Sequence, residues 1–241
     1  MKITINQEFI RRRATLARWS SLIGLGVLFV GLIISFNQAY YYWSLPALVV
    51  GFFLASISAF NANRYVKEPR PDQALAKVLR GFDSTYHLFI FTAPVPQVLL
   101  TPARVYALLV KHQDGVIRRQ GKRWRRDLNL RRFFLFFGEE GLGSPARDAQ
   151  AEAGRLRREL VKVLGEEAPP VEAIAVFTHP NARLELSEST PDEADGVPVL
   201  AGKDLKKYLR AQPKGQPFNA DVRRRLTAFL QGSGTVQEET E

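Results

Sequence analysis

The chain has 241 residues and a formal net charge of +10, which suits one membrane anchor plus one medium-sized soluble domain that meets anionic partners. Cysteine is absent, which excludes disulfides and thiolate metal sites and fits a reducing compartment. Because apolar residues crowd into the first quarter of the chain, the first elements to consider are membrane segments.

Two long uncharged stretches follow each other near the N-terminus. Trp19–Phe36 holds 18 residues without a charge, and Leu45–Phe60 holds 16. Ala39–Ser44 lengthens the second to the roughly 20 residues that cross about 30 Å of hydrocarbon. The alternative is a cleaved signal peptide plus one buried core helix, but the first stretch is too long and no small-residue cleavage site follows it. The pattern predicts a transmembrane helical hairpin over residues 19–64.

The charges beside the hairpin predict its orientation. Basic residues precede the first stretch and follow the second, whereas Asn37–Ser44 between them is uncharged and rich in aromatic residues. Positive residues remain on the cytoplasmic side, and aromatic rings settle at headgroup level. We therefore expect a multi-pass protein of the plasma (cell) membrane, with both termini and the soluble domain in the cytoplasm. The basic residues are Lys2, Arg11, Arg12, Arg13, Arg18, Arg64, Lys67 and Arg70.

Small residues recur along both stretches and would let the two helices approach closely. Glycine is also simply common in membrane helices, and this plainer interpretation is preferred on sequence alone. The residues are Gly24, Gly26, Gly31, Gly51, Ala55 and Ser58.

The soluble part reads as strands first, then a crossover helix and further strands, which predicts a mixed α/β fold. Strands are expected at 86–92, 97–101, 105–111, 116–120, 123–126, 171–178, 183–186 and 197–200, and helices at 73–79, 147–164, around Leu205–Leu209 and around Val222–Leu230. The predicted organisation is a basic cytoplasmic N-terminus (1–18), the hairpin (19–64), a soluble domain (71–212), a C-terminal helix (213–231) and a disordered acidic tail (232–241).

The segment Val98–Lys111, with the following Asp114-Gly115-Val116-Ile117, resembles the nuclease-related domain family, known as NERD. Ala146–Leu164, Ala175–Ala182 and Val197–Leu209 extend the resemblance over most of residues 71–212. It implies a restriction-endonuclease-like mixed-sheet α/β domain. It also implies metal-dependent phosphodiester hydrolysis, in which acidic residues on two strands and a lysine hold Mg²⁺ and position water.

The chain departs from the family pattern at both acidic positions. Lys111 stands at the lysine position, but Leu109 replaces the acid two residues before it, and Pro96 with Gln97 occupies the place of the aspartate. We therefore expect no cofactor and a lost catalytic activity, with Lys111 as a relic. Lys111 could instead simply carry its ammonium group from the strand end into water. A nuclease with Mg²⁺ on a rearranged acidic site is the alternative; it would draw on Asp83, Asp114, Glu139 or Glu140.

Positive charge is concentrated in Arg104–Arg132, which contains ten basic residues and two acidic ones. Such a surface can bind DNA or RNA through counterion release, or acidic phospholipid headgroups. A solvated hairpin without a partner is the plain alternative. The candidate contact residues are Arg118, Arg119, Lys122, Arg123, Trp124, Arg125 and Arg126, with Trp124 available for stacking.

These features predict a membrane-anchored, catalytically inactive nuclease-like domain that binds anionic partners at the cytoplasmic face. An accessory subunit of a membrane protein complex is a further alternative, in which the apolar Phe133–Phe137 segment would contact the protein partner. Single histidines at 87, 112 and 179 are more typical of surface or core positions than of zinc ligands.

Overall fold

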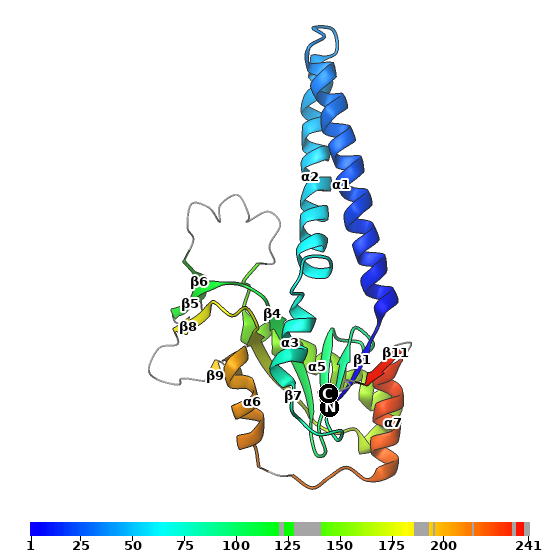
Figure 1. Ribbon diagram of the computed structural model, residues 1–241, viewed down its shortest axis with the longest axis vertical. Helices are drawn as coiled ribbons and strands as arrows, with labels where there is room; N and C mark the ends of the chain where they lie inside the picture. The colour runs from blue at the N-terminus through cyan, green and yellow to red at the C-terminus, as the bar shows by residue number, and fades with distance from the viewer. Residues whose placement is uncertain are drawn as a thin grey trace. The chain divides into compact units, whose positions relative to one another are not determined.

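The computed structural model describes residues 1–120, 123–127, 141–185, 193–194, 196–213, 215–232 and 235–238. The chain forms two compact units. A helical unit is built from Glu8–Arg70, and an α/β unit combines Met1–Gln7, Pro71–Asp127 and the described residues from Leu142 onward. Figure 1 shows that both ends of the chain belong to the α/β unit.

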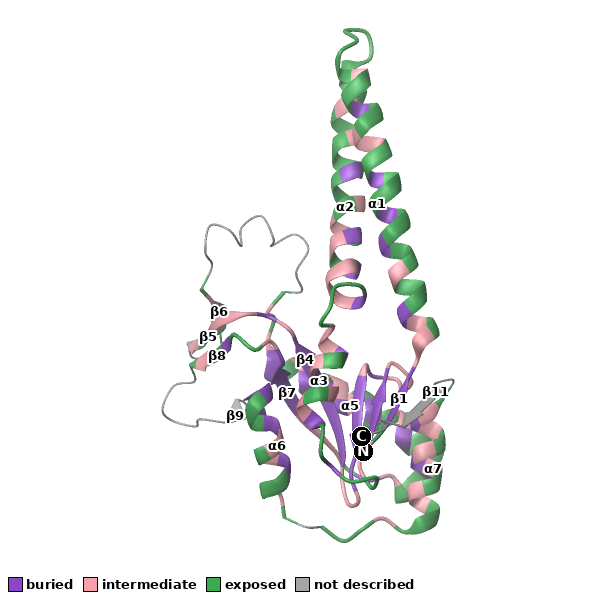
Figure 2. Ribbon diagram, viewed as in Figure 1, coloured by how far each residue is buried: buried purple, intermediate pink, exposed green. Residues whose placement is uncertain are grey.

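The helical unit is a hairpin of two long helices, α1 (Gln7–Ser35) and α2 (Ser44–Tyr65), joined through a short 3-10 turn η1 (Tyr41–Trp43). Both helices are long and apolar enough to cross a membrane. Only 22% and 11% of their apolar windows are buried, so neither is the core helix of a soluble domain. In Figure 2 they are mostly green and pink, with isolated purple residues along the line where they meet.

Most of the buried residues along this line are small and let the helices pack closely: Ala17, Ser20, Gly24, Gly31, Gly51 and Ser58. A Cβ added to Gly31 would lie 2.7 Å from the Cβ of Ala47, and one added to Gly51 would lie 2.5 Å from the side chain of Leu28. Gly24 likewise faces Ala55, whereas Gly26 has open space around it. The plainer interpretation of these glycines is therefore wrong for three of the four, because they form the helix–helix contact.

The α/β unit is built on an eight-stranded mixed sheet with the order β11-β1-β2-β3-β4-β7-β10-β9. β1–β2, β4–β7 and β7–β10 are parallel pairs, and the remaining pairs are antiparallel. The strands are β1 (Lys2–Ile5), β2 (His87–Ile90), β3 (Gln97–Leu100), β4 (Val105–Lys111), β7 (Val171–Phe177), β9 (Glu193–Ala194), β10 (Val197–Ala201) and β11 (Thr235–Glu238).

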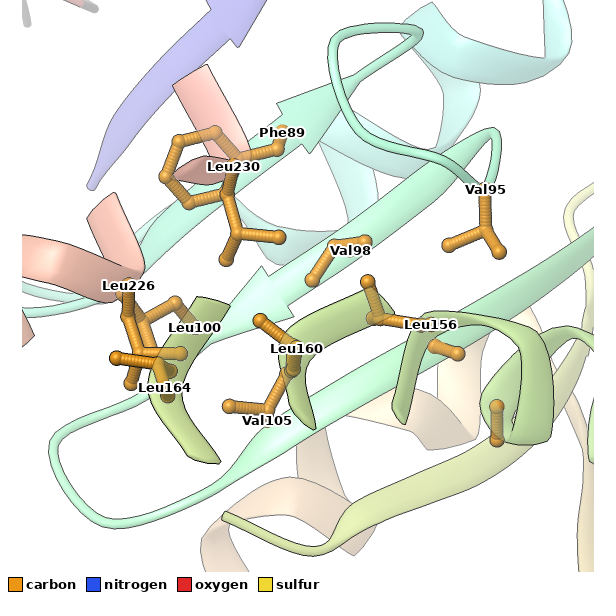
Figure 3. Packing of buried hydrophobic residues seen from close by; sticks show 12 residues of the cluster. Phe89, Val95, Val98, Leu100, Val105, Leu156, Leu160, Leu164, Leu226 and Leu230 are labelled. Atoms are coloured by element: carbon orange, nitrogen blue, oxygen red, sulfur yellow. The ribbon is translucent and has the colours of Figure 1, made fainter. Parts of the chain in front are cut away.

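Helices cover both faces of this sheet. α5 (Pro145–Leu164) and α7 (Ala220–Gln231) contribute leucines to one core, together with residues of β2, β3 and β4. Figure 3 shows Leu156, Leu160 and Leu230 near Val98 of β3, and Leu226 beside Leu100 and Leu164. α3 (Pro71–Leu79) and α6 (Gly202–Ala211) pack against each other and against strands of the sheet. Every residue of β4 is buried, as expected for a strand covered on both sides.

The two ends of the chain depart most from the sequence expectation. The segment 1–18 was expected to be a basic cytoplasmic extension, but Lys2–Ile5 is a strand inside the sheet and α1 starts at Gln7. The segment 232–241 was expected to be a disordered tail, but Thr235–Glu238 pairs with β1. In Figure 1 the blue β1 lies beside the red β11. Strand pairing through backbone groups leaves no mark in composition, and the polar residues of the tail conceal it.

The mixed α/β class is confirmed, and the expected strands and helices of the soluble part correspond to observed elements, with shifts of a few residues at their ends. Along α5, Leu156, Leu160 and Leu164 are buried, whereas Val163 is 46% exposed. The 3.6-residue period places Val163 at the edge of the stripe.

The glycine contact predicts the effect of one substitution. Gly31→Leu should push α1 and α2 apart and cost about 1–3 kcal/mol of unfolding free energy, because a Cβ there already collides with Ala47. Gly26→Leu on the same helix, where nothing lies within 4 Å, is the matched control and should be close to neutral. Denaturant titration of the full chain in micelles, followed by circular dichroism, measures both. Equal effects of the two variants would contradict the proposed contact.

The β1–β2 pair predicts a pH dependence. His87 of β2 is buried, and its Nε2 lies 2.7 Å from the Thr4 hydroxyl of β1. Burial lowers the pKa of His87 to about 4 from 6.5, with help from the positive charges of Lys2 and Arg223. Because the folded chain holds this imidazole neutral, its contribution to stability is complete above pH 6.5 and is lost as the pH falls toward about 4.

His87→Gln should flatten that dependence, because glutamine can still hydrogen-bond Thr4 but does not titrate. The measurement is the thermal midpoint of the full chain as a function of pH for the wild-type protein and the variant. Parallel curves for the two proteins would show that this histidine does not control the acid side of the stability profile.

Candidate functional site

The carboxyl ends of five strands meet at one edge of the large sheet. β1, β2, β4, β7 and β10 all point the same way, since β3 is antiparallel to both of its neighbours. In α/β sheets, ligands bind outside the carboxyl ends of the strands. This edge carries Lys111 at the end of β4 and Thr178 just after β7, and the chain also leaves it from β1 through Asn6 into α1.

Lys111 itself is buried, with 4% of its surface exposed. The interpretation that it carries its ammonium group into water is therefore wrong. Its carbonyl accepts the backbone N–H of Thr178 at 2.9 Å, which ties β4 to the end of β7. Leu109 packs in an apolar cluster with Ala175 and Phe177, and Gln97 is 3% exposed. Leu109 and the pair Pro96 and Gln97, where the resemblance expects acids, thus carry no carboxylate; Leu109 and Gln97 are buried and Pro96 is half-buried.

Two histidines lie beside Lys111. His112 and His179 meet edge to face with ring centroids 5.0 Å apart. His112 Nδ1 lies 3.0 Å from the hydroxyl of Thr178, and this hydroxyl lies 3.5 Å from the Lys111 carbonyl. Nδ1 of His179 accepts the N–H of Asn181 at 3.1 Å. Among the described residues no group of three histidine, aspartate or glutamate side chains is arranged to hold a metal.

The basic residues expected at a binding surface lie on a second, three-stranded sheet with the order β6-β5-β8. Its strands are β5 (Gly115–Gln120), β6 (Arg123–Arg126) and β8 (Ala182–Glu185), and β5 and β6 form the expected antiparallel pair. This sheet packs Ile117 and Trp124 onto the cluster that contains Leu109. The carboxyl end of β4 leads directly into it.

Two of the candidate arginines are neutralised within the fold. Arg118 Nε donates to Glu185 at 2.6 Å and its Nη1 lies 3.3 Å from Asp127, and the hydrogen bond to Glu185 raises the pKa of Arg118. Arg126 binds the carboxylate of Asp114, and its Nε donates to the Asp114 carbonyl at 2.8 Å. With only 10% of its side chain exposed, Arg126 holds the β4–β5 connection.

The other candidate contact residues differ in their exposure to solvent. Arg123 and Arg125 alternate outward along β6 and are exposed, whereas Trp124 between them is half-buried and packs on the core. Arg119 is half-buried. Lys122 lies outside the described residues, as do Phe133–Phe137, Glu139 and Glu140. Of the described candidates, Arg123 and Arg125 are therefore the ones most accessible to a large anion.

A second basic surface was not singled out from the sequence. Lys203, Lys207 and Arg210 are exposed on α6 at positions i, i+4 and i+7, and Lys77 is exposed on the neighbouring α3. Lys206 donates to the Arg80 carbonyl, and both Lys206 and Arg210 lie over the Phe82 ring, at 6.0 and 5.6 Å from its centroid. The helical spacing of these charges could have revealed this face, which we name the α3–α6 surface.

Comparison with known protein families, with curated proteins and with solved structures gives no match.

The different roles of two neighbouring arginines can be tested by stability. Arg126→Ala should cost about 1–3 kcal/mol, because it leaves Asp114 without its ion-pair partner. Arg125→Ala, one residue earlier and exposed, should change stability by less than about 0.5 kcal/mol. Chemical denaturation of the full chain in detergent measures both. A small effect of Arg126→Ala would show that its ion pair is not structural.

Proposed function

We propose that this protein is a membrane-anchored, non-catalytic α/β domain that binds phosphate-bearing partners at the cytoplasmic face. The observation that carries the proposal is the parallel pairing of β1 with β2. β1 precedes the helical hairpin and β2 follows it, yet Ile3 and Leu88 are neighbours in one sheet. A folded sheet cannot have a bilayer between two of its strands, so both ends of the hairpin lie on one side.

The lipid-facing character of α1 and α2 supports the anchor. Large apolar side chains such as Leu22, Phe29 and Phe53 are more than 60% exposed, and a contiguous surface of this kind is not stable in water. At the turn between the helices, Tyr42 and Trp43 are also exposed, in keeping with aromatic residues at a headgroup layer. The basic residues at the opposite end favour the cytoplasm for the α/β unit.

The proposed scaffold is a restriction-endonuclease-like domain of the nuclease-related family, in which the catalytic acids have been replaced. The scaffold rests on the resemblance of Val98–Lys111, and the replacement of the acids is supported by the buried Leu109, two residues before Lys111, and by the buried Gln97. A leucine packed between Ala175 and Phe177 offers no oxygen to a hard cation. Binding without hydrolysis is the remaining use of such a domain for phosphate-bearing partners.

The phosphate contacts are proposed for Arg123 and Arg125. Both are exposed on β6, an edge strand of its sheet, and lie two residues apart on one face. Two guanidinium groups at this spacing can contact the phosphates of a nucleic-acid backbone or of acidic headgroups without reading sequence. The core packing of Trp124 holds the strand in place beneath them.

The test uses the full chain in nanodiscs of neutral phosphatidylcholine, so that bound DNA reports on the protein alone. Arg123→Glu/Arg125→Glu should weaken salt-sensitive binding of fluorescent duplex DNA, measured by anisotropy, by about tenfold or more. Arg155→Glu/Arg157→Glu, which reverses two exposed charges on α5, is the matched control. A parallel assay with acidic liposomes distinguishes lipid from nucleic acid. If neither DNA nor acidic lipid binding responds to the β6 variant, the proposed contact surface is wrong.

Incubation of the same preparation with DNA and Mg²⁺ or Mn²⁺ tests the non-catalytic assignment. We expect intact DNA. Cleavage by the wild-type chain that is lost on Lys111→Met would contradict the proposal and favour a nuclease with rearranged acids.

A further inference from the structure

The end of the hairpin opposite the aromatic turn contains a cluster that joins α1 to α2. Phe9 of α1 and Tyr65 of α2 meet edge to face with ring centroids 5.9 Å apart. The guanidinium of Arg13 lies over Phe9, 5.3 Å from its centroid, and that of Arg64 lies over Tyr65 at 5.9 Å. We call these four residues the arginine–aromatic row. Each of the two guanidinium groups thus lies near one ring, and the two rings come from different helices.

The helices beneath the row are packed tightly. The hydroxyl of Ser58 donates to the carbonyl of Ala17 at 2.8 Å across the interface, and Ala17 and Ser58 are both buried. Tyr65 is 9% exposed, so its ring is held by neighbours rather than by solvent. Arginines that already contact a ring lose less side-chain freedom on binding a ligand than arginines that extend freely into water.

The position of the row along the helices matches the depth of lipid phosphates. An α-helix rises 1.5 Å per residue. Arg13 is six residues before Trp19, where the uncharged stretch of α1 begins, or about 9 Å along the helix. Arg64 is four residues after Phe60, or about 6 Å. The polar layer on each side of a bilayer is about 5–8 Å thick beyond the hydrocarbon, so Arg64 lies within the headgroup layer and Arg13 lies at its outer edge.

The charge around the row is strongly positive. Arg11 and Arg18 are also exposed on α1, and Arg64, Lys67 and Arg70 follow the apolar part of α2, with one acid, Glu68, among them. The one acid of α1, Glu8, is paired with Arg12 one turn later. A group of four to eight basic residues directly beside a membrane helix attracts acidic lipids, each contributing about 1 kcal/mol.

We infer that the arginine–aromatic row is a binding site for the phosphate groups of acidic phospholipids in the cytoplasmic leaflet. This inference rests on the proposed anchoring of α1 and α2 in the membrane. A guanidinium beside a ring keeps N–H groups that can donate to phosphate oxygens. Arg13 and Arg64 thus differ from the surrounding arginines in their contacts with aromatic rings.

The experiment compares the full chain in nanodiscs of phosphatidylcholine alone and of phosphatidylcholine mixed with phosphatidylglycerol. The wild-type chain should unfold at a higher temperature in the mixed nanodiscs. Arg13→Gln/Arg64→Gln should lose most of that increase. Arg11→Gln/Arg12→Gln, which removes the same charge from neighbouring positions outside the row, is the matched control and should keep most of it.

A second readout covers variants that fold poorly in either lipid. Native mass spectrometry counts the phosphatidylglycerol molecules that remain with the detergent-purified chain. Arg13→Lys/Arg64→Lys, which keeps the charge but loses the planar group, should retain fewer than wild type and more than the glutamine variant. Equal losses in the row variant and in the Arg11/Arg12 control would show a diffuse charge effect and overturn the site.

Alkaline extraction of membranes from cells that produce the full chain distinguishes failure of the membrane anchor from failure of the lipid site. Release of the wild-type chain into the supernatant would contradict the anchoring, and the lipid site with it. Retention in the membrane without any difference between the two nanodisc types would contradict the lipid site alone.

Discussion

The parallel pairing of β1 with β2 is the constraint on which the rest of the arrangement depends. It makes the hairpin an insertion within the α/β unit, because the sheet begins before α1 and resumes after α2. β11 then adds to the outer side of β1, so that four residues near each end of the chain close one edge of the sheet. A fragment that starts after the hairpin would expose β2 and leave β11 without its partner strand.

The two units are stabilised by different physics. In the α/β unit, leucines of α5 and α7 bury apolar surface against β2, β3 and β4, which is favourable because water is released. In the proposed membrane anchor that driving force does not operate between the helices, and the contact of Gly24, Gly31 and Gly51 with the opposite helix replaces it through close packing. The basic residues are likewise divided: Arg118 and Arg126 serve the fold through Glu185 and Asp114, whereas Arg123 and Arg125 point outward.

The structural elements that could be predicted are those whose signals lie within a short stretch of sequence. The hairpin, β4 and α5 are visible in the sequence, because uncharged length, a run of apolar residues and a 3.6-residue period are properties of a short window. β1 was not predictable, since Lys2–Ile5 is a four-residue strand whose partners are more than 80 residues away. The burial of Lys111 and the ion pair of Arg126 also depend on tertiary neighbours. Residue counts found the positive charge of Arg104–Arg132, but only the structure separates its structural arginines from its accessible ones.

Because the chain has no native cysteine, single introduced cysteines and a membrane-impermeant maleimide can show whether both ends of the hairpin lie on one side of the membrane. The positions are Glu8 before the first apolar stretch, Gln38 in the turn and Arg157 on α5, all of them exposed. Gln38→Cys should be labelled in intact cells, and Glu8→Cys and Arg157→Cys only after permeabilisation. Labelling of Glu8→Cys and Arg157→Cys from opposite sides of the membrane would contradict the shared placement of both ends of the hairpin.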